Sequence, residues 1–212
     1  MTDRTILAVG DSNTYGVPPM RSLDENTRLS AAERWVGVMS DVLGEGTEVI
    51  AEGLPGRTAG ATPDPELGPA TNGQLGLRMA LLSHGPIDDL VIMLGTNDQK
   101  AHFGRTAEAI AGELAACLTI AVSPEMQTRH GGFQTWLICP PAVQEIGFFA
   151  SYFYGAAAKS AALPGLLAPL AAVYGARFIN ANDHIATDAQ EGVHFDAATH
   201  AVLGRAIAQA LA

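Results

Sequence analysis

The chain has few of the features that mark several protein classes. It carries only two cysteines, Cys117 and Cys139, which lie far apart in apolar segments, so buried free thiols are expected rather than a disulfide. Basic residues are scarce, because 12 Lys and Arg stand against 22 Asp and Glu and give a formal net charge of -10. A nucleic-acid-binding protein needs a basic face for phosphates, so we do not expect that class. The same acidic balance offers no attraction to an anionic membrane surface.

Membrane, targeting and cofactor patterns are also missing from the sequence. No apolar run reaches the length expected of a membrane span, and the first residues lack the basic and apolar regions of a signal peptide. A cytoplasmic protein is therefore the expectation. The first apolar run is not followed by a G-x-G-x-x-G turn, which argues against a dinucleotide-binding protein. No His, Cys and Asp cluster has the spacing of metal ligands, so we expect neither a metal nor another cofactor.

What the sequence does have is a regular alternation of short apolar runs and longer helical patterns. The strand-like runs lie at 5–9, 47–51, 89–94, 133–139 and 176–180. Helical spacing of apolar residues, or richness in Ala and Leu, marks 32–44, 75–84, 106–122, 157–174 and 196–211. This alternation predicts parallel β-α-β units and a three-layer α/β/α fold, and residues 1–212 fit one domain. Pro164 should interrupt or kink the fourth helical stretch.

Two segments break the alternation. Residues 55–74 hold several Gly and Pro and are expected to form a loop. Residues 140–155 follow a strand and carry five of the thirteen aromatic residues of the chain: Phe148, Phe149, Tyr152, Phe153 and Tyr154. They form either a helix packed into the core or an exposed apolar surface. Such a surface would be a substrate wall, a subunit interface, or both.

Ser12 is the candidate nucleophile. The apolar run Ile6-Leu7-Ala8-Val9 is followed at once by Gly10-Asp11-Ser12-Asn13, so the serine comes at the carboxyl end of the first strand. In open α/β sheets that edge is where ligands bind. A serine hydroxyl is a weak nucleophile at neutral pH, so Ser12 needs a general base to take its proton.

His194 is the best candidate for that base among six histidines. It lies in Glu191-Gly192-Val193-His194, just beyond the last strand, on the loop that leads to the last helix. A carboxylate three residues earlier, in a turn, can accept from the ring N–H, fix the tautomer and stabilise the imidazolium. Glu191 is the expected acid, with Asp188 as the alternative. A backbone carbonyl could also orient the ring.

Donors for a developing oxyanion are expected from the next two strand ends. Gly56 follows the second strand, and Asn97 follows the third, in Gly-Thr-Asn-Asp. Backbone N–H groups and Asn side chains suit this task. Asp11 and Asp98 are expected to be structural, bracing the Ser12 turn and the Asn97 loop by accepting backbone N–H bonds. Arg57 has two open interpretations, a place at the pocket rim or a pairing with a surface acid.

These blocks together resemble the SGNH (GDSL-type) hydrolase superfamily, in that family's order from residue 6 to 196. Ser12 matches its nucleophile, Gly56 and Asn97 match its oxyanion donors, and His194 matches its general base. The resemblance implies a flavodoxin-like three-layer fold with a five-stranded parallel sheet. It also implies ester or thioester hydrolysis without a metal, with the Ser12 N–H as the remaining oxyanion donor.

Three stretches resemble one branch, the small bacterial arylesterases, some of which act as acyltransferases or perhydrolases: residues 34–38, 49–54 and 93–98. Members of that branch are often homo-oligomers whose subunits shape a restricted apolar channel, which favours acyl transfer. The aromatic residues of 148–154 would then be interface and channel. The chain departs from the family at Asn13, where leucine is common, and at Glu191, where Asp is usual.

The sequence is also compatible with other functions. A carbohydrate O-acetyl esterase would need an exposed polar groove, and a lysophospholipase or thioesterase would need a long apolar acyl channel. A non-catalytic binding module of the same fold is also possible, with Glu191 marking a decayed triad. The natural substrate is a small-molecule ester in the esterase interpretations.

Overall fold

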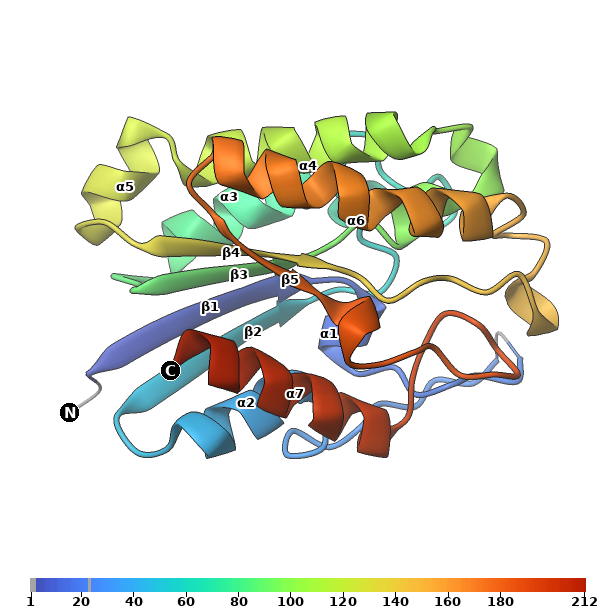
Figure 1. The fold of residues 1–212 in the computed structure, drawn as a ribbon, viewed down its shortest axis with the longest axis horizontal. Helices are drawn as coiled ribbons and strands as arrows, with labels where there is room; N and C mark the ends of the chain where they lie inside the picture. Colours follow the sequence, from blue (N-terminus) through green and yellow to red (C-terminus); the bar gives the residue numbers. More distant parts are fainter. Residues whose placement is uncertain (1–2, 23) are drawn as a thin grey trace.

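The computed structural model describes residues 3–22 and 24–212, which build one five-stranded sheet (Figure 1). All strand pairs are parallel, in the order β2-β1-β3-β4-β5. The strands are β1 (Arg4–Gly10), β2 (Thr47–Gly53), β3 (Asp89–Met93), β4 (Gln134–Cys139) and β5 (Arg177–Asn180). This is the flavodoxin-like order, so the predicted fold class is confirmed. Each strand overlaps the run that predicted it.

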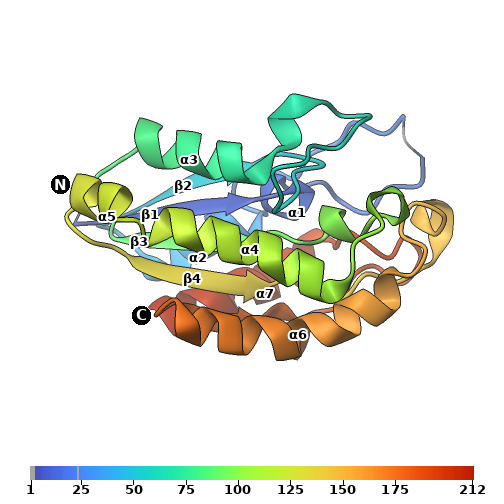
Figure 2. The same ribbon diagram turned by 90° about the horizontal axis from the view of Figure 1, so that it is seen from above.

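Helices cover both faces of the sheet and bury it completely at its centre (Figures 1 and 2). On one face lie α2 (Trp35–Leu43) and α7 (Ala197–Leu211). On the other lie α3 (Gly73–Ser83), α4 (Ala107–Ala121), α5 (Pro124–His130) and α6 (Ala156–Val173). Ile6 and Ala8 pack on the first face, while Leu7 and Val9 pack on the second. A strand buried on both sides reads as an unbroken apolar run, which is why the run at 6–9 predicts β1.

The last helix begins where its capping residue predicts. Asp196 is the N-cap of α7, and its Oδ1 accepts a hydrogen bond of 2.8 Å from the backbone N–H of Thr199. The short helix α5 was not among the expected elements. Its start signals are local, since Ser123 caps the helix through a bond to the N–H of Met126 and Pro124 occupies the first turn.

Helix α6 overturns one expectation and part of another. It remains one helix of 18 residues although it contains Pro164 and Pro169, and Figure 2 shows it curved rather than interrupted. By length and composition alone it is also apolar enough to cross a membrane, contrary to the expectation from the sequence. Its buried side chains, among them Leu163 and Leu167, pack against α4, β4 and β5, as in a core helix. That packing keeps the helix together across its prolines.

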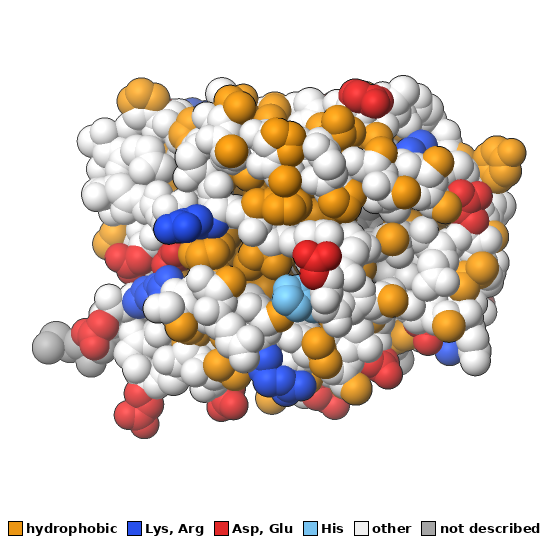
Figure 3. Space-filling view, viewed as in Figure 1, with side chains coloured by type: hydrophobic (Ala, Val, Ile, Leu, Met, Phe, Trp, Pro, Cys, Tyr) orange, Lys and Arg blue, Asp and Glu red, His pale blue; other side chains and the backbone are white. Residues whose placement is uncertain are grey.

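The carboxyl ends of the strands meet at one edge, and the loops that leave them carry the candidate residues. Ser12 follows β1, Gly56 follows β2 and Asn97 follows β3, with β1 hydrogen-bonded between the other two strands. His194 lies between β5 and α7. At the edge of the sheet opposite β2, β5 lies between α6 and α7. Figure 3 has the same view as Figure 1 and shows hydrophobic side chains gathered on the surface around α6 and β5.

Candidate active site

Ser12 opens a single-turn helix, α1 (Ser12–Tyr15), directly after β1. Asp11 caps this turn, because its Oδ1 accepts a 2.9 Å hydrogen bond from the N–H of Asn13. The predicted structural role of Asp11 is therefore confirmed. Burial raises the pKa of Asp11 to about 6, although the Asn13 bond and the nearby His194 act in the opposite direction.

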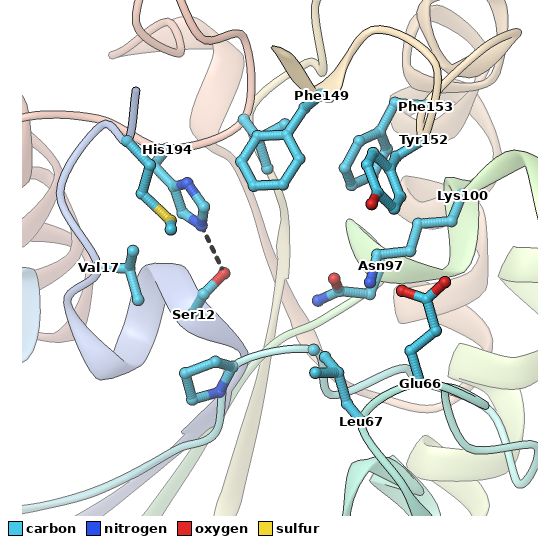
Figure 4. A pocket seen from close by; sticks show the side chains of 14 residues that line it. Ser12, Val17, Glu66, Leu67, Asn97, Lys100, Phe149, Tyr152, Phe153 and His194 are labelled. Carbon is cyan, nitrogen blue, oxygen red and sulfur yellow. Dashed lines mark hydrogen bonds between the residues drawn. The ribbon is translucent and has the colours of Figure 1, made fainter. Parts of the chain in front are cut away.

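His194 and Glu191 complete a continuous chain of side chains with Ser12. The Oγ of Ser12 lies 2.9 Å from Nε2 of His194 (Figure 4), and Nδ1 of His194 is hydrogen-bonded to Oε1 of Glu191. With its Nδ1–H donated to the carboxylate, the ring presents Nε2 as the acceptor for the serine hydroxyl. All three residues are buried. This is the geometry in which a histidine can take a proton from a serine.

The second oxygen of Glu191 holds the loop itself. Oε2 accepts hydrogen bonds from the N–H groups of Val193 at 2.8 Å and His194 at 2.7 Å. Burial by itself would raise the pKa of Glu191, but the hydrogen bonds from His194 and Val193 outweigh it and place the pKa below its ordinary value. Gly192, at φ +88°, gives the turn that folds the carboxylate back. Glu191 is therefore ionised against His194.

Asp188 has a different place. Its Oδ1 accepts bonds from the N–H groups of Gln190 and Glu191 and lies 3.3 Å from Nη1 of Arg21. It caps the turn that carries Glu191 and is not bonded to the His194 ring. Of the two carboxylates that the sequence left open, the structure brings Glu191 to His194.

Gly56 and Asn97 reach the same pocket as Ser12. Gly56 has φ +79°, a left-handed conformation that favours glycine, whereas the Leu67 side chain beside it is exposed and free to move. The side-chain amide of Asn97 faces Ser12 across the pocket (Figure 4), and its Nδ2 donates a 3.1 Å hydrogen bond to the carbonyl of Arg57. The structure thus brings all four predicted strand-end residues together.

The pocket is a cavity of about 360 Å³ with a mostly apolar wall. Phe149, Tyr152 and Phe153 line one side of it (Figure 4), and the ring of Phe149 stands edge-on to His194 at 5.8 Å between centroids. The aromatic segment 148–154 therefore forms a wall of the cavity. It is built from the single turn η4 (Gly147–Phe149) and irregular backbone, not from a helix packed into the core. Tyr154 is 76% exposed.

Asp98 and Arg57 support the pocket from behind. Oδ2 of Asp98 accepts a 2.8 Å bond from the N–H of Ala59, so it ties the Asn97 turn to the loop after β2, as a structural role predicts. Burial raises the pKa of Asp98 to about 6 in spite of its bond to Arg105. Arg57 was expected at the pocket rim or paired with a surface acid. It is instead buried, with its guanidinium on backbone carbonyls.

Two supporting contacts were not predicted. Nδ2 of Asn13 donates a 3.2 Å hydrogen bond to the carbonyl of Val193. Nζ of Lys100, which lines the pocket, lies 2.6 Å from Oδ2 of the buried Asp64. The sequence offers no signal for either pair, because the partners are far apart along the chain and side-chain direction decides both contacts.

Other reactive residues lie away from this chemistry. Cys117 and Cys139 are buried free thiols, as expected. His200 is buried, accepts a bond from the N–H of Trp35, and burial lowers its pKa to about 3. Among the residues that the structure describes, no group of three or more His, Cys, Asp or Glu is placed to hold a metal ion.

Comparisons with known proteins agree with this geometry. The family model of the GDSL-like lipase/acylhydrolase family matches residues 8–202. This chain belongs to that family. Its fold matches the crystal structure of Est24, a carbohydrate acetylesterase from Sinorhizobium meliloti, with a TM-score of 0.92, 35% identity and 98% of each chain covered. The M. smegmatis aryl esterase matches with a TM-score of 0.90, 33% identity and 98% of each chain covered.

A carbohydrate acetylesterase family member from Sinorhizobium meliloti is also similar, at 30% identity and a TM-score of 0.85 over 98% of this chain and 97% of that one. A search among curated proteins gave no match. The family and these neighbours make this GDSL-type protein a carboxylic ester hydrolase, in the arylesterase branch that the sequence resembles. The interpretation as a non-catalytic module is therefore set aside.

Proposed function

We propose that this GDSL hydrolase is a serine esterase that cleaves short-chain alkyl or aryl esters through an acyl-enzyme on Ser12. The observation that carries the proposal is the continuous arrangement of Ser12, His194 and Glu191, with 2.9 Å between Oγ and Nε2. Each of these side chains opens on, or directly supports, one cavity of about 360 Å³. That volume is at the small end for ligand sites, which suits a small ester.

Acylation follows from the hydrogen bonds. His194 Nε2 takes the proton of the Ser12 hydroxyl as Oγ attacks the ester carbonyl carbon, and Glu191 stabilises the imidazolium through Nδ1. The carbonyl oxygen becomes an oxyanion. It is stabilised by hydrogen bonds from the N–H groups of Ser12 and Gly56 and from the Asn97 amide. His194 then returns the proton to the leaving alkoxide or phenoxide, and the alcohol departs.

Deacylation repeats these steps with water. His194 takes a proton from the water molecule as it attacks the acyl carbonyl, and gives that proton to Ser12 Oγ as the acid is released. The low exposure of Ser12 and His194, at 6% and 4%, keeps both proton transfers away from bulk water. Within such a site, fixed donors stabilise an oxyanion more strongly than they would in water.

Hydrolysis of p-nitrophenyl esters from acetate to octanoate tests the proposal. Wild type should cleave acetate with the highest kcat/KM, and Ser12→Ala should lose the activity. A profile that rises toward octanoate would favour lipase-like or thioesterase use. Equal hydrolysis by wild type and Ser12→Ala would overturn the proposal. Arg78→Ala on the exposed face of α3, paired only with Glu125, is the matched control that should keep full activity.

A carbohydrate O-acetyl esterase is the second candidate, and one observation favours it. Glu66 and Lys100 place charged groups along the Asn97 side of the pocket (Figure 4), where hydroxyl groups of a sugar could bind them. Est24 is named a carbohydrate acetylesterase. We expect Glu66→Ala to lower kcat/KM for an acetylated sugar while leaving p-nitrophenyl acetate unaffected. An equal effect on both esters would remove this candidate.

We further propose a homo-oligomer in which residues 148–154 contribute to a subunit interface, and acyl transfer to alcohols beside hydrolysis. The support is the exposed Tyr154 next to the aromatic wall of the cavity, since an interface there would restrict water at the acyl-enzyme. The solution mass from light scattering decides the first part. A monomer would contradict the proposed oligomer. The ratio of transfer product to hydrolysis product, measured with added alcohol, tests the proposed acyl transfer.

A further inference from the structure

Arg57 lies behind the oxyanion side of the pocket, and nothing in the proposed reaction accounts for it. The residue follows Gly56 directly and is only 7% exposed. Arginine is rarely buried to this extent unless a partner takes up its charge. Here its guanidinium binds main-chain carbonyls, and the carboxylates of Glu52 and Asp11 lie close enough to act on its charge.

The guanidinium joins the ends of two neighbouring strands. Nη1 donates a 3.1 Å hydrogen bond to the carbonyl of Gly10, the last residue of β1, and a second bond to the carbonyl of Glu52 near the end of β2. Gly10 immediately precedes Asp11 and Ser12. The side chain therefore connects the segment that carries the nucleophile with the strand that leads to Gly56. Hydrogen bonds from a charged donor are stronger than neutral ones.

The backbone of Arg57 reaches the third strand end. Its carbonyl accepts the 3.1 Å bond from Nδ2 of Asn97, and its own N–H donates to the carbonyl of Leu54 at 3.1 Å. One residue thus contacts the segments of all three predicted oxyanion donors. The remaining N–H of the Asn97 amide is the one left for a substrate oxygen.

The side chain is held in place from its outer side by α3. A Cβ added at Gly76 would lie 3.2 Å from Nε of Arg57, so the helix passes close against the guanidinium. The guanidinium is enclosed between α3 and the two strand ends. A group fixed in this way can set the position of its hydrogen-bond partners rather than follow their motion.

We propose that Arg57 is the positioning residue of the oxyanion hole, fixing Gly56 and Asn97 relative to Ser12. This inference rests on the proposed function, because it assumes attack of Ser12 on a carbonyl. Oxyanion donors act only when they lie about 2.7–3.1 Å from the developing charge. Displacing a reacting group by about 1 Å can cost ~10²-fold in rate. Loss of the Arg57 side chain should therefore act on the transition state more than on substrate binding.

The experiment compares Arg57→Ala and Arg57→Lys with a substitution of Arg129, an exposed arginine that also binds the main chain. Arg129 is the control, since it also donates to two backbone carbonyls, those of Leu81 at 3.3 Å and Leu82 at 2.6 Å, but lines no part of the pocket. We expect Arg57→Ala to lower kcat about 10- to 100-fold with KM changed less than about threefold. Arg57→Lys should retain part of the activity. Arg129→Ala should keep the wild-type kcat.

Chemical rescue separates positioning from damage to the fold. Methylguanidinium at non-denaturing concentration should raise kcat of Arg57→Ala and leave Arg129→Ala and wild type unchanged. Thermal unfolding of each variant confirms that the assays are made on folded protein. A folded Arg57→Ala enzyme with wild-type kcat would overturn the inference. A fall in kcat matched by Arg129→Ala at an equal loss of stability would overturn it as well.

A stoichiometric reaction keeps the two proposals distinguishable. The rate at which a fluorophosphonate modifies Ser12 needs the same donors, because the attack places negative charge on a phosphoryl oxygen. Wild type should react and Ser12→Ala should not, and failure there would defeat the proposed function. If wild type reacts, Arg57→Ala should react at least about tenfold more slowly. An unchanged rate would defeat the role of Arg57 alone.

Discussion

Asn13 Nδ2 donates a 3.2 Å hydrogen bond to the carbonyl of Val193, so the residue after the nucleophile holds the loop that carries the base. Both residues are buried. The bond joins Asn13 in the turn after β1 to a loop 180 residues later. Leucine, which is common at this position in the family that the sequence resembles, could not form it. The side chain of Asn13 therefore contributes directly to the alignment of Ser12 with His194.

Asn13→Leu should lower kcat by about two- to tenfold, because a buried hydrogen bond contributes about 1 kcal/mol and its loss loosens the His194 loop. Steady-state kinetics with p-nitrophenyl acetate measure the effect. Asn180→Ala is the control, since the side chain of Asn180 bonds to its neighbours Asn182 and Asp183 at the end of β5, away from the pocket. Equal kcat values for wild type and Asn13→Leu would show that the bond does not align the base.

The two carboxylates near His194 should differ sharply on substitution. Glu191→Gln removes the charge bonded to Nδ1, and a comparable change in a serine protease triad costs ~10⁴ in kcat. We expect a loss of about 10²- to 10⁴-fold. Asp188→Asn keeps the oxygen that caps the turn and should stay within about threefold of wild type. The reverse order of effects would assign the acid to Asp188.

Asp11 should make the protein less stable at neutral pH than at acidic pH. Its folded pKa of about 6 lies above the unfolded value, so the folded state holds more protons between about pH 4 and pH 6. That contribution is present below the unfolded pKa and is lost as pH rises through the folded pKa. Asp11→Asn keeps the acceptor for the Asn13 N–H. It should therefore gain about 2 kcal/mol in unfolding free energy, relative to wild type, between pH 4 and pH 8.

Urea unfolding at pH 4 and pH 8 tests this sign. Asp196→Asn is the contrasting control, because the bond from the Thr199 N–H holds the pKa of Asp196 below its ordinary value. Its charged form stabilises the fold above the unfolded pKa, and that stability is lost only below about pH 4, so the change caused by Asp196→Asn should be nearly the same at pH 4 and pH 8. A gain for Asp11→Asn that is the same at both pH values would contradict the linkage.

Phe149 should limit the size of the ester. Its ring lies edge-on to His194 and lines the cavity, so Phe149→Ala enlarges the space beside the base. The ratio of kcat/KM for butyrate over acetate, and for a bulky over a small alcohol, should rise. Val173→Ala is the control, since Val173 is exposed at the end of α6 and lines no part of the cavity. An unchanged ratio for Phe149→Ala would show that this aromatic side chain does not limit the size of the ester.

The fold and the centre of the site were predictable because they depend on local patterns. Doubly buried strands read as apolar runs such as 6–9, and each strand end is followed by its own short motif. Parallel strands bring those ends to one edge without further information. Glu191 could be favoured over Asp188 because it lies three residues before His194, so that one turn of the chain brings its carboxylate to the ring.

The remaining features depend on long-range side-chain direction. The sequence gives no sign that Arg57 turns inward to the Gly10 carbonyl, or that Asn13 reaches Val193, because those partners lie 47 and 180 residues away. Pro164 was a local signal that tertiary packing overrode, since α6 stays continuous where it covers the sheet. The aromatic segment 148–154 left two alternatives open because Phe149, Tyr152 and Phe153 have the spacing of a helix face, whereas the structure has only the single turn η4 and irregular backbone there.

An acyl group on Ser12 is the central intermediate of the proposed reaction, and it can be detected directly. Wild type is mixed with p-nitrophenyl acetate, quenched with acid within the first turnovers, digested and measured by mass spectrometry. We expect one acetyl group on the peptide that contains Ser12, accumulating further in Glu191→Gln if deacylation slows more than acylation, and none on Ser12→Ala. Ester turnover without an acetyl group on Ser12, and undiminished in Ser12→Ala, would contradict the proposed reaction.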